Sequence, residues 1–166
     1  YNVYRGTVSG GGSLLTTIEN TWNTATIDSG GDVGLDSSLA LDSSGNLHIS
    51  YFDNSNYDLK YAVLSGGVWT IETVDSTGNV GKFSSLALDS SGNPHISYFD
   101  NSNYDLKYAV LSGGSWSIET VDSAGTVGLY SSIALDSSGN PHISYLDASN
   151  TALCGGYSCL KYAVKS

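Results

Sequence analysis

The chain has 166 residues and a mass of 17.3 kDa, the size of one ordinary domain. Its net charge is −10, and no basic patch offsets it, so binding to nucleic acid or to an anionic membrane surface is disfavoured. No run approaches the roughly 18 apolar residues of a membrane span, so membrane insertion is not expected. Twelve Tyr, three Trp and 20 Gly, with no Met, indicate an all-β chain with frequent turns.

Residues 1–21 form an N-terminal extension outside the repeated part of the chain. The sequence begins at Tyr1 without a Met or a signal-peptide pattern, so we expect a mature, processed form or a fragment. SLLTTIEN is strand-like. Two alternatives stay open: a decorated terminus that lies on the rest of the protein, or a donor strand that adds to a neighbouring subunit's sheet.

The rest of the chain is one unit repeated with a period of 47 residues. Residues 28–74 and 75–121 are identical at 40 of 47 positions, and a third copy spans 122–166. Tryptophan and histidine recur with the same period, at Trp22, Trp69 and Trp116 and at His48, His95 and His142. Such self-similarity is the mark of a repeat architecture.

Each repeat contains four strand-like runs separated by turns. In the second repeat these are 84–89, 95–100, 106–111 and 116–122. Apolar residues point to both faces, with Leu86 and Leu88 on one side and Ala87 on the other, so each sheet needs neighbours on both sides. Four strands in 40 to 50 residues predict a β-propeller blade. A linear β-solenoid is the alternative, but its coils are usually shorter.

The phrases LDSSGNPHISYFD, DLKYAV and SGGSWSIETVDS resemble repeats of bacterial extracellular β-propeller proteins of the BNR-like and lectin-like kind. The resemblance covers 22–166 and implies a propeller of four-stranded antiparallel blades at an extracellular or cell-surface location. It implies no single activity, because propellers host many. The Trp-Asp dipeptide of WD40 repeats and the sialidase pattern S-x-D-x-G-x-x-W are absent, which argues against sialidase chemistry.

The strand count leaves the last blade incomplete. The third repeat ends after three strands, while WNTATID at 22–28 aligns with the fourth strands of the other repeats. We therefore expect about three blades per chain, with the N-terminal strand supplying the missing strand. Three blades are too few to close. Two chains could exchange 22–28 to form one six-bladed ring, ends could pair into a fibre, or the residues could belong to a longer polypeptide.

The third repeat also carries an enlarged loop with the two cysteines. Cys154 and Cys159 are predicted to form a disulfide that staples this loop. Their four-residue spacing differs from that of zinc and redox motifs. Residues 147–160 break the symmetry of the repeat, which makes them a candidate contact for a protein partner.

Repeated aromatic residues are candidates for stacking on glycans. The candidates are Trp22, Trp69, Trp116, Tyr57 and Tyr104. The tryptophans could equally cap the apolar space between blades.

The DNSNYD turns are weak calcium candidates. Their oxygen ligands would be Asp53, Asn56 and Asp58, and Asp100, Asn103 and Asp105. The glycine and distal glutamate of an EF-hand are missing. A turn stabilised by side-chain-to-backbone hydrogen bonds explains the composition equally well, so no metal is predicted.

Two further sets of repeated side chains are interpreted as structural. Each histidine is expected to bond a nearby backbone group or the aspartate of the LDSSGN turn. Lys60 with Glu72, and Lys107 with Glu119, are expected to form cross-strand charge pairs.

Catalytic features are not found in the sequence. No nucleophile stands beside a base, and the carboxylates of the core repeat are duplicated rather than gathered in one asymmetric site. We therefore expect no enzyme and no cofactor. The favoured function is a non-enzymatic extracellular structural module that self-assembles by strand exchange into a homo-oligomer or surface filament. The alternative is a carbohydrate-binding, lectin-like propeller with repeated shallow sites.

Overall fold

The computed structural model describes residues 3–7, 13–17, 22–149 and 152–165. All sheets in this part of the chain are antiparallel. The N-terminal strands β1 (Val3–Thr7) and β2 (Ser13–Thr17) pair with each other as a separate two-stranded sheet. The remainder of the expected extension lies outside the described residues.

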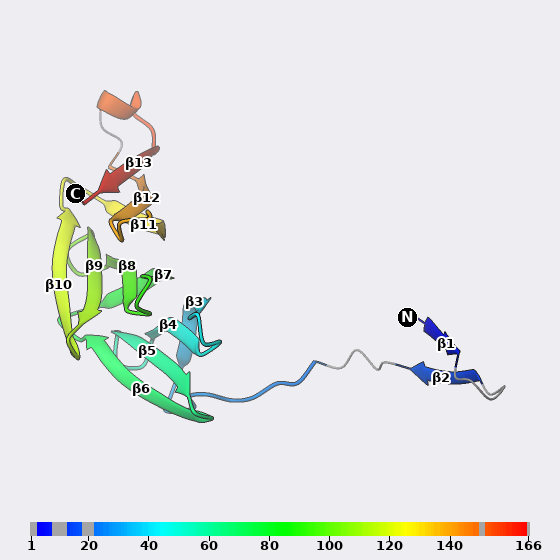
Figure 1. The fold of residues 1–166 in the computed structure, drawn as a ribbon. Coiled ribbons are helices and arrows are strands. Elements are labelled where there is room, and N and C mark those ends of the chain that lie inside the picture. The colour runs from blue at the N-terminus through cyan, green and yellow to red at the C-terminus, as the bar shows by residue number, and fades with distance from the viewer. Residues whose placement is uncertain (1–2, 8–12, 18–21, 150–151, 166) are drawn as a thin grey trace.

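Three larger sheets follow, each built from strands in chain order (Figure 1). The first sheet comprises β3 (Val33–Leu41), β4 (Leu47–Asp53), β5 (Asp58–Ser65) and β6 (Val68–Asp75). The second comprises β7 (Val80–Leu88), β8 (Pro94–Asp100), β9 (Asp105–Ser112) and β10 (Ser115–Asp122). The third has only β11 (Val127–Leu135), β12 (Pro141–Asp147) and β13 (Cys159–Val164), with a short 3-10 helix, η1 (Ala152–Cys154), before β13.

These sheets confirm an all-β fold of antiparallel sheets with three or four strands each. Within these three sheets, strand positions match the expected runs except that the first strand of each sheet begins about four residues early. In the second sheet this strand starts at Val80, which pairs with Asp100 across an irregular stretch with two register shifts. Phe83 lies within that stretch at φ 54°, a left-handed conformation that is unusual for a bulky residue. Because these irregularities interrupt the alternation of side chains along the strand, a search for a period of two did not predict the pairing before residue 84.

The tight turns between the first two strands of each sheet are held by one aspartate. In the first sheet Asp42 accepts hydrogen bonds from the backbone N–H groups of Ser44 and Asn46, both at 2.8 Å, and from the Asn46 side chain. Gly45 supplies the positive φ of 81° that this turn needs. The same bonds recur in the next two repeats, so identical turn sequences produce identical hairpins.

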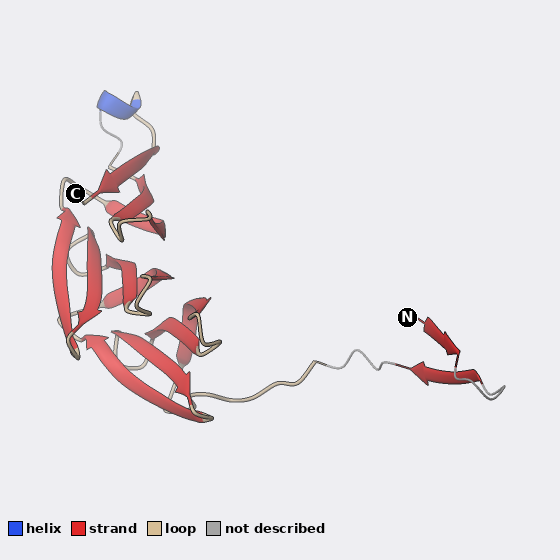
Figure 2. Ribbon diagram, in the orientation of Figure 1, coloured by secondary structure: helices blue, strands red, loops and turns tan. Residues whose placement is uncertain are grey.

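The three sheets stack face to face along an arc (Figures 1 and 2). The first strands make the closest contacts between sheets, β3 with β7 and β7 with β11. The outer strands β6 and β10 lie on the outer side of the arc. Successive sheets therefore fan out from their first strands.

The arc formed by these sheets is open. The expectation that residues 22–28 complete the third sheet of the same chain is wrong. Residues 22–28 form no strand and lie beside the first sheet, whereas β13 is the edge of the third. Three stacked sheets do not bring the two ends of the arc together. Among the described residues, no helix has the length and apolar character needed to cross a membrane.

Candidate functional site

The contact between the first and second sheets is a closely packed apolar layer. Leu59 and Tyr61 of β5 are buried against Val80 and Leu86 of β7 and against Tyr98 of β8. A β-carbon on Gly81 would stand 2.7 Å from the Cα of Leu59, so only glycine admits this approach. Burial of a side chain such as Leu59 contributes about 1.5–3 kcal/mol.

A polar layer fixes the register between the same two sheets. The Oγ atoms of Ser50 and Ser84 lie 2.9 Å apart, and the Ser84 hydroxyl also donates to the carbonyl of Asp36 at 2.8 Å. The N–H of Leu86 donates to Ser38 Oγ at 3.0 Å. Since hydrogen bonds are directional, these contacts specify one relative placement of the sheets.

A buried carboxylate lies at the outer end of this contact. Asp75 ends β6 and accepts hydrogen bonds from the Tyr98 hydroxyl at 2.8 Å and from Lys107 Nζ at 2.5 Å. Burial alone would raise the pKa of Asp75, but the bonds from Lys107, the Thr77 backbone and Tyr98 outweigh it and lower the pKa. The group is therefore a structural anion rather than a proton donor.

The second and third sheets repeat these contacts 47 residues later. Leu106 lies against Gly128 as Leu59 lies against Gly81, and Asp122 accepts bonds from Tyr145 and Lys161. The two contacts differ at the end of the fourth strand. Val74 and Asp75 at the end of β6 are buried, whereas their counterparts Val121 and Asp122 stay half-buried. Among the described residues, the third sheet has three strands, and no fourth strand covers Val121 and Asp122.

The free face of the first sheet exposes side chains that are buried in the other sheets. Leu39 is 58% exposed, while its counterparts Leu86 and Ile133 are 7% and 8% exposed. Gly34, the counterpart of Gly81 and Gly128, has no atom within 4 Å of its β-carbon position. This face lacks the preceding sheet that the other two possess.

The third sheet, at the other end of the stack, also exposes side chains whose counterparts are buried in the first two sheets. Leu160 of β13 is 81% exposed, whereas its counterparts Leu59 and Leu106 are fully buried. Tyr162 is exposed as well, although Tyr61 and Tyr108 are buried. Apolar side chains with buried counterparts thus lie at both ends, which makes these two faces candidate interaction sites.

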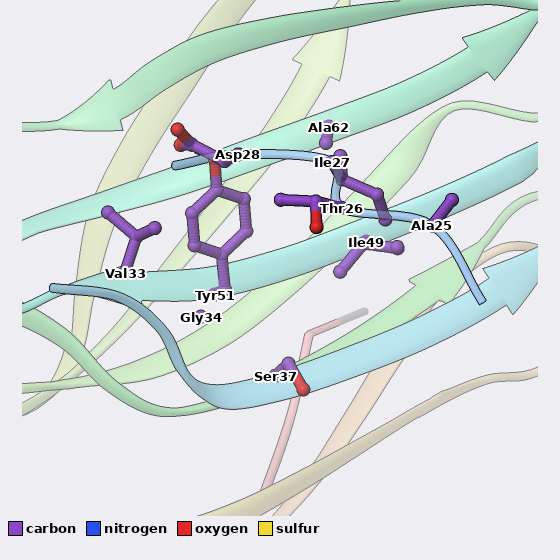
Figure 3. A pocket seen from close by; sticks show the side chains of 10 residues that line it. All are labelled: Ala25, Thr26, Ile27, Asp28, Val33, Gly34, Ser37, Ile49, Tyr51 and Ala62. Atoms are coloured by element: carbon purple, nitrogen blue, oxygen red, sulfur yellow. The ribbon is translucent and has the colours of Figure 1, made fainter. Parts of the chain in front are cut away.

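Residues 22–28 already occupy part of the missing preceding sheet. The Tyr51 hydroxyl donates to Asp28 at 2.6 Å, as Tyr98 does to Asp75. Hydrogen bonds, first from Tyr51 and then from the Gly30 backbone, lower the pKa of Asp28. Figure 3 shows Ile27 and Asp28 above Tyr51 and Ile49 in an open pocket. Trp22 is 93% exposed.

A second open pocket runs beside β13, where the fourth strand of the third sheet would lie. Its lining includes Tyr108, Val121, Ile143, Ala163 and Val164. At the corresponding place between the first two sheets, Trp116 of β10 packs edge-on against Tyr61, with ring centroids 5.4 Å apart. The groove is therefore the unfilled counterpart of the Trp116 site.

The proposed glycan-stacking residues occupy different environments. Trp116 is half-buried between two sheets, in line with the alternative that the tryptophans cap the apolar space there, and Trp69 is half-buried near the start of β6. Tyr57 and Tyr104 are half-exposed at equivalent turns with φ of 65°. Nothing brings these five aromatics together into one surface, and their role in glycan binding remains a prediction.

The first carboxylate of each DNSNYD turn is engaged in the turn itself. Asp53 is buried, and its Oδ1 accepts the N–H groups of Ser55 and Asn56 while Oδ2 accepts the Asn56 side chain. Asp100 makes the same bonds with Ser102 and Asn103. This arrangement matches the alternative of a side-chain-stabilised turn.

The histidines lie near the expected turn aspartate, but the hydrogen-bond partner of each ring is a tyrosine hydroxyl, and His48 Nε2 makes no hydrogen bond to Asp42. His48 Nδ1 lies 2.5 Å from the Tyr61 hydroxyl, and its Nε2 lies 3.7 Å from Asp42 in the LDSSGN turn. His95 repeats both contacts with Tyr108 and Asp89. Burial lowers the pKa of His95, although Asp89 opposes this effect.

The expected cross-strand charge pairs are wrong. Lys107 is opposite Thr120, and Glu119 is opposite Tyr108, so lysine and glutamate point to opposite faces of the sheet. Lys107 instead reaches Asp75 in the preceding sheet, and Glu119 pairs with Lys165 at 2.7 Å. In the first sheet the same register places Lys60 opposite Thr73.

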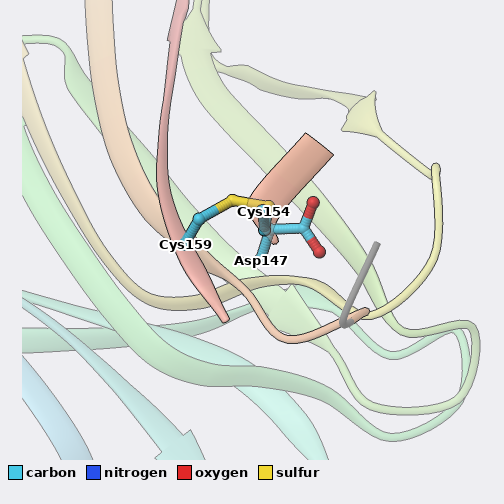
Figure 4. A group of neighbouring side chains, drawn as sticks. All are labelled: Asp147, Cys154 and Cys159. Atoms are coloured by element: carbon cyan, nitrogen blue, oxygen red, sulfur yellow. A yellow bond between two sulfur atoms is a disulfide. The ribbon is translucent and has the colours of Figure 1, made fainter. Parts of the chain in front are cut away.

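The enlarged loop of the third repeat contains the predicted disulfide between Cys154 and Cys159 (Figure 4). Asp147 lies close to both sulfur atoms. Because the sulfurs are bonded to each other, they are not available as thiolate ligands, and the group is a staple rather than a metal site. Asp147 Oδ1 accepts the Ser149 N–H at 2.8 Å.

The fold defines an all-β protein made of repeated antiparallel sheets. No protein-family model matches the sequence, and no curated protein matches it. Among solved structures, the chain is similar to a fucose lectin from Kordia zhangzhouensis, which was determined in complex with methyl-fucoside. The two share 18% sequence identity and a TM-score of 0.48, and the match covers 78% of this chain and 97% of that chain. It is also similar to a protein of unknown function from Dyadobacter fermentans DSM 18053, with 13% identity and a TM-score of 0.58.

The Dyadobacter likeness supports the fold alone. It covers 77% of this chain and 36% of the other, so the present chain spans little more than a third of that protein's length. The resemblance to bacterial extracellular propeller repeats is supported as far as the all-β fold, and no family match extends it.

Proposed function

We propose that the chain is a non-enzymatic structural module, a three-blade segment of a β-propeller that assembles with further copies of itself. One observation carries the proposal: side chains buried between neighbouring sheets are exposed at the two ends of the stack. Leu39 at one end and Leu160 at the other are the clearest examples, since each has buried counterparts in the repeats. The ends are thus the two halves of a contact that the chain already makes twice.

The propeller interpretation rests on how the sheets are joined and stacked. Each complete sheet has four strands in chain order, and successive sheets are closest at their first strands. Radial repetition of four-stranded sheets around an axis defines a propeller. A linear solenoid would not require the fanned arrangement visible in Figure 2.

Strand exchange would complete both ends together. In the proposed assembly, residues 22–28 of one copy pair with the open edge of β13 in another copy and form the fourth strand of its third sheet. An edge strand offers unpaired backbone groups to an added strand. In its own chain, Asp28 already bonds Tyr51, just as the ends of β6 and β10 bond the sheets that follow them. The segment therefore bridges two copies.

The side chains that could suggest catalysis have structural partners in the proposed module. Asp75 and Asp122 are neutralised by lysines, and the turn aspartates accept backbone N–H groups. The disulfide is compatible with an extracellular location, which remains part of the proposal.

Size-exclusion chromatography with multi-angle light scattering tests the proposal on the unmodified protein. We expect a species heavier than the 17.3 kDa chain at micromolar concentration. A stable monomer over that concentration range would overturn self-assembly.

Carbohydrate binding is the second candidate function. It is favoured by the half-exposed Tyr57 and Tyr104, which recur at identical turns and could each stack on a sugar ring. A glycan array should then show binding that is lost in the double variant Y57A/Y104A. Silence of the native protein across the array would remove this candidate.

A further inference from the structure

We infer that the partner is a single second copy, and that two chains close one ring of six sheets. This inference rests on the proposed function, because it specifies the assembly that the two ends form. It excludes an open filament, in which every copy would bind two different neighbours.

The step from one sheet to the next is nearly constant, since corresponding hydrogen bonds across the two contacts agree in length within about 0.3 Å. Ser50 and Ser84 are 2.9 Å apart between the first two sheets, and Ser97 and Ser131 are 2.9 Å apart between the next two. The backbone bond from the N–H of Val80 to the preceding sheet is 2.9 Å, as is that of its counterpart Val127. Because the same residues make nearly equal contacts, closely the same spatial operation relates each successive pair of sheets. A third application of this operation places a new sheet against β13.

A repeated operation either closes a ring or continues as an open helix. Propellers close with about four to eight blades. Each chain supplies three sheets once its third sheet has received 22–28 of a partner, so the total must be a multiple of three. Six is the only such multiple in that range. Two chains therefore suffice, and both ends of each chain are used.

The residues of the closing contact between two chains are obtained from the contacts between sheets of one chain by moving each residue to its counterpart one repeat later. Ser144 of one chain should lie beside Ser37 of the other, as Ser97 lies beside Ser131. Leu160 should lie over Gly34 of the other chain, in the space that is empty in the single chain. The groove beside β13 would receive residues 22–28 of the other chain, with Trp22 next to Tyr108. The ring contains this contact twice.

Cysteine cross-linking tests the register and the closure together. In the double variant S37C/S144C, each new cysteine meets its partner only across the proposed contact. Under mild oxidation and non-reducing electrophoresis, we expect one covalent dimer band and no higher species. Each single variant should remain a monomer band. The variant S50C/S84C is the matched control, because it cross-links the same contact inside one chain and should give only a monomer.

The other possible results of the cross-linking experiment distinguish a ring from a filament and from a closed monomer. A ladder of covalent multimers from S37C/S144C would overturn the ring and indicate a filament, while self-assembly would stand. An internally cross-linked monomer would indicate closure within one chain and overturn both proposals. For the unmodified protein, the ring requires a mass of about 35 kDa, twice 17.3 kDa, that does not grow with concentration. A mass that keeps growing with protein concentration would overturn only the ring. A mass of one chain would overturn both the ring and self-assembly.

Discussion

The Cα atom of Leu59 lies 2.7 Å from the position that a β-carbon on Gly81 would occupy. The same relationship holds between Leu106 and Gly128, at the same distance. The chain therefore builds one close backbone contact twice and has the parts for a third, Leu160 and Gly34, at opposite ends. Substitutions at Gly34 and at Leu160 should therefore each disturb this third contact.

Replacing Gly34 with alanine should abolish or strongly weaken self-association. The added β-carbon meets nothing in the single chain, but it would meet the leucine of an incoming β13. G45A is the matched control, since Gly45 also has a positive φ and open space around it. Both variants carry a similar backbone strain of about 1–2 kcal/mol. Light scattering over a dilution series should show association lost in G34A and kept in G45A; equal behaviour of the two would contradict the assigned contact.

Replacing Leu160 with alanine should affect association but not the folding of the single chain. Leu160 is exposed, so its truncation removes little buried area and should change the free energy of unfolding by less than about 0.5 kcal/mol under dilute conditions. Burial against a second copy is worth about 1.5–3 kcal/mol, so the dissociation constant should rise at least about tenfold. L106A removes the buried counterpart and should cost about 2–5 kcal/mol of folding stability. Urea denaturation with light scattering separates the effects, and destabilised L160A monomers would refute this assignment.

Replacing Asp75 with asparagine should destabilise the protein by about 3 kcal/mol at pH 7, the lower end of the cost of breaking a buried ion pair, because the partly buried Lys107 would lose its charge partner. The folded-state pKa of Asp75 is lowered, so the unfolded state takes up a proton first as the pH falls. The stabilisation is present above the unfolded value of about 4 and is lost as the pH falls through the folded value. Urea denaturation between pH 5 and pH 2 should show a smaller loss of stability in D75N than in the native protein. Parallel pH profiles of D75N and the native protein would contradict this role of Asp75.

Replacing His95 with glutamine should reduce the loss of stability on mild acidification. Burial lowers the folded-state pKa of His95, while Asp89 and the Tyr108 hydroxyl face the ring. The unfolded chain therefore binds a proton first as the pH drops through about 6.5, and the folded state loses stability from there down to its own lower pKa. The difference in unfolding free energy between pH 7 and pH 5 should be smaller in H95Q than in the native protein. Parallel pH profiles would show that His95 does not contribute.

The repeat by itself determined the tight turns, the number of larger sheets and most strand positions, but not the early start of each first strand. These features depend on local chemistry, such as the alternation of side chains along a strand and the Asp and Gly of the SSGN turn, which act within a few residues. The disulfide between Cys154 and Cys159 was equally readable, because its two ends are close in the sequence. The missing fourth strand of the third repeat followed from counting.

Only the tertiary structure decided which side chains meet between sheets. The sequence pattern paired Lys107 with Glu119, but neighbouring strands place them on opposite faces, and the partner of Lys107 is Asp75 in another sheet. Gly34 and Leu160 look like any other copy of their repeat, and only their exposure marks them as ends. Identical residues thus have different environments, because burial depends on what packs against a sheet, and that neighbour lies a full repeat away or in another molecule.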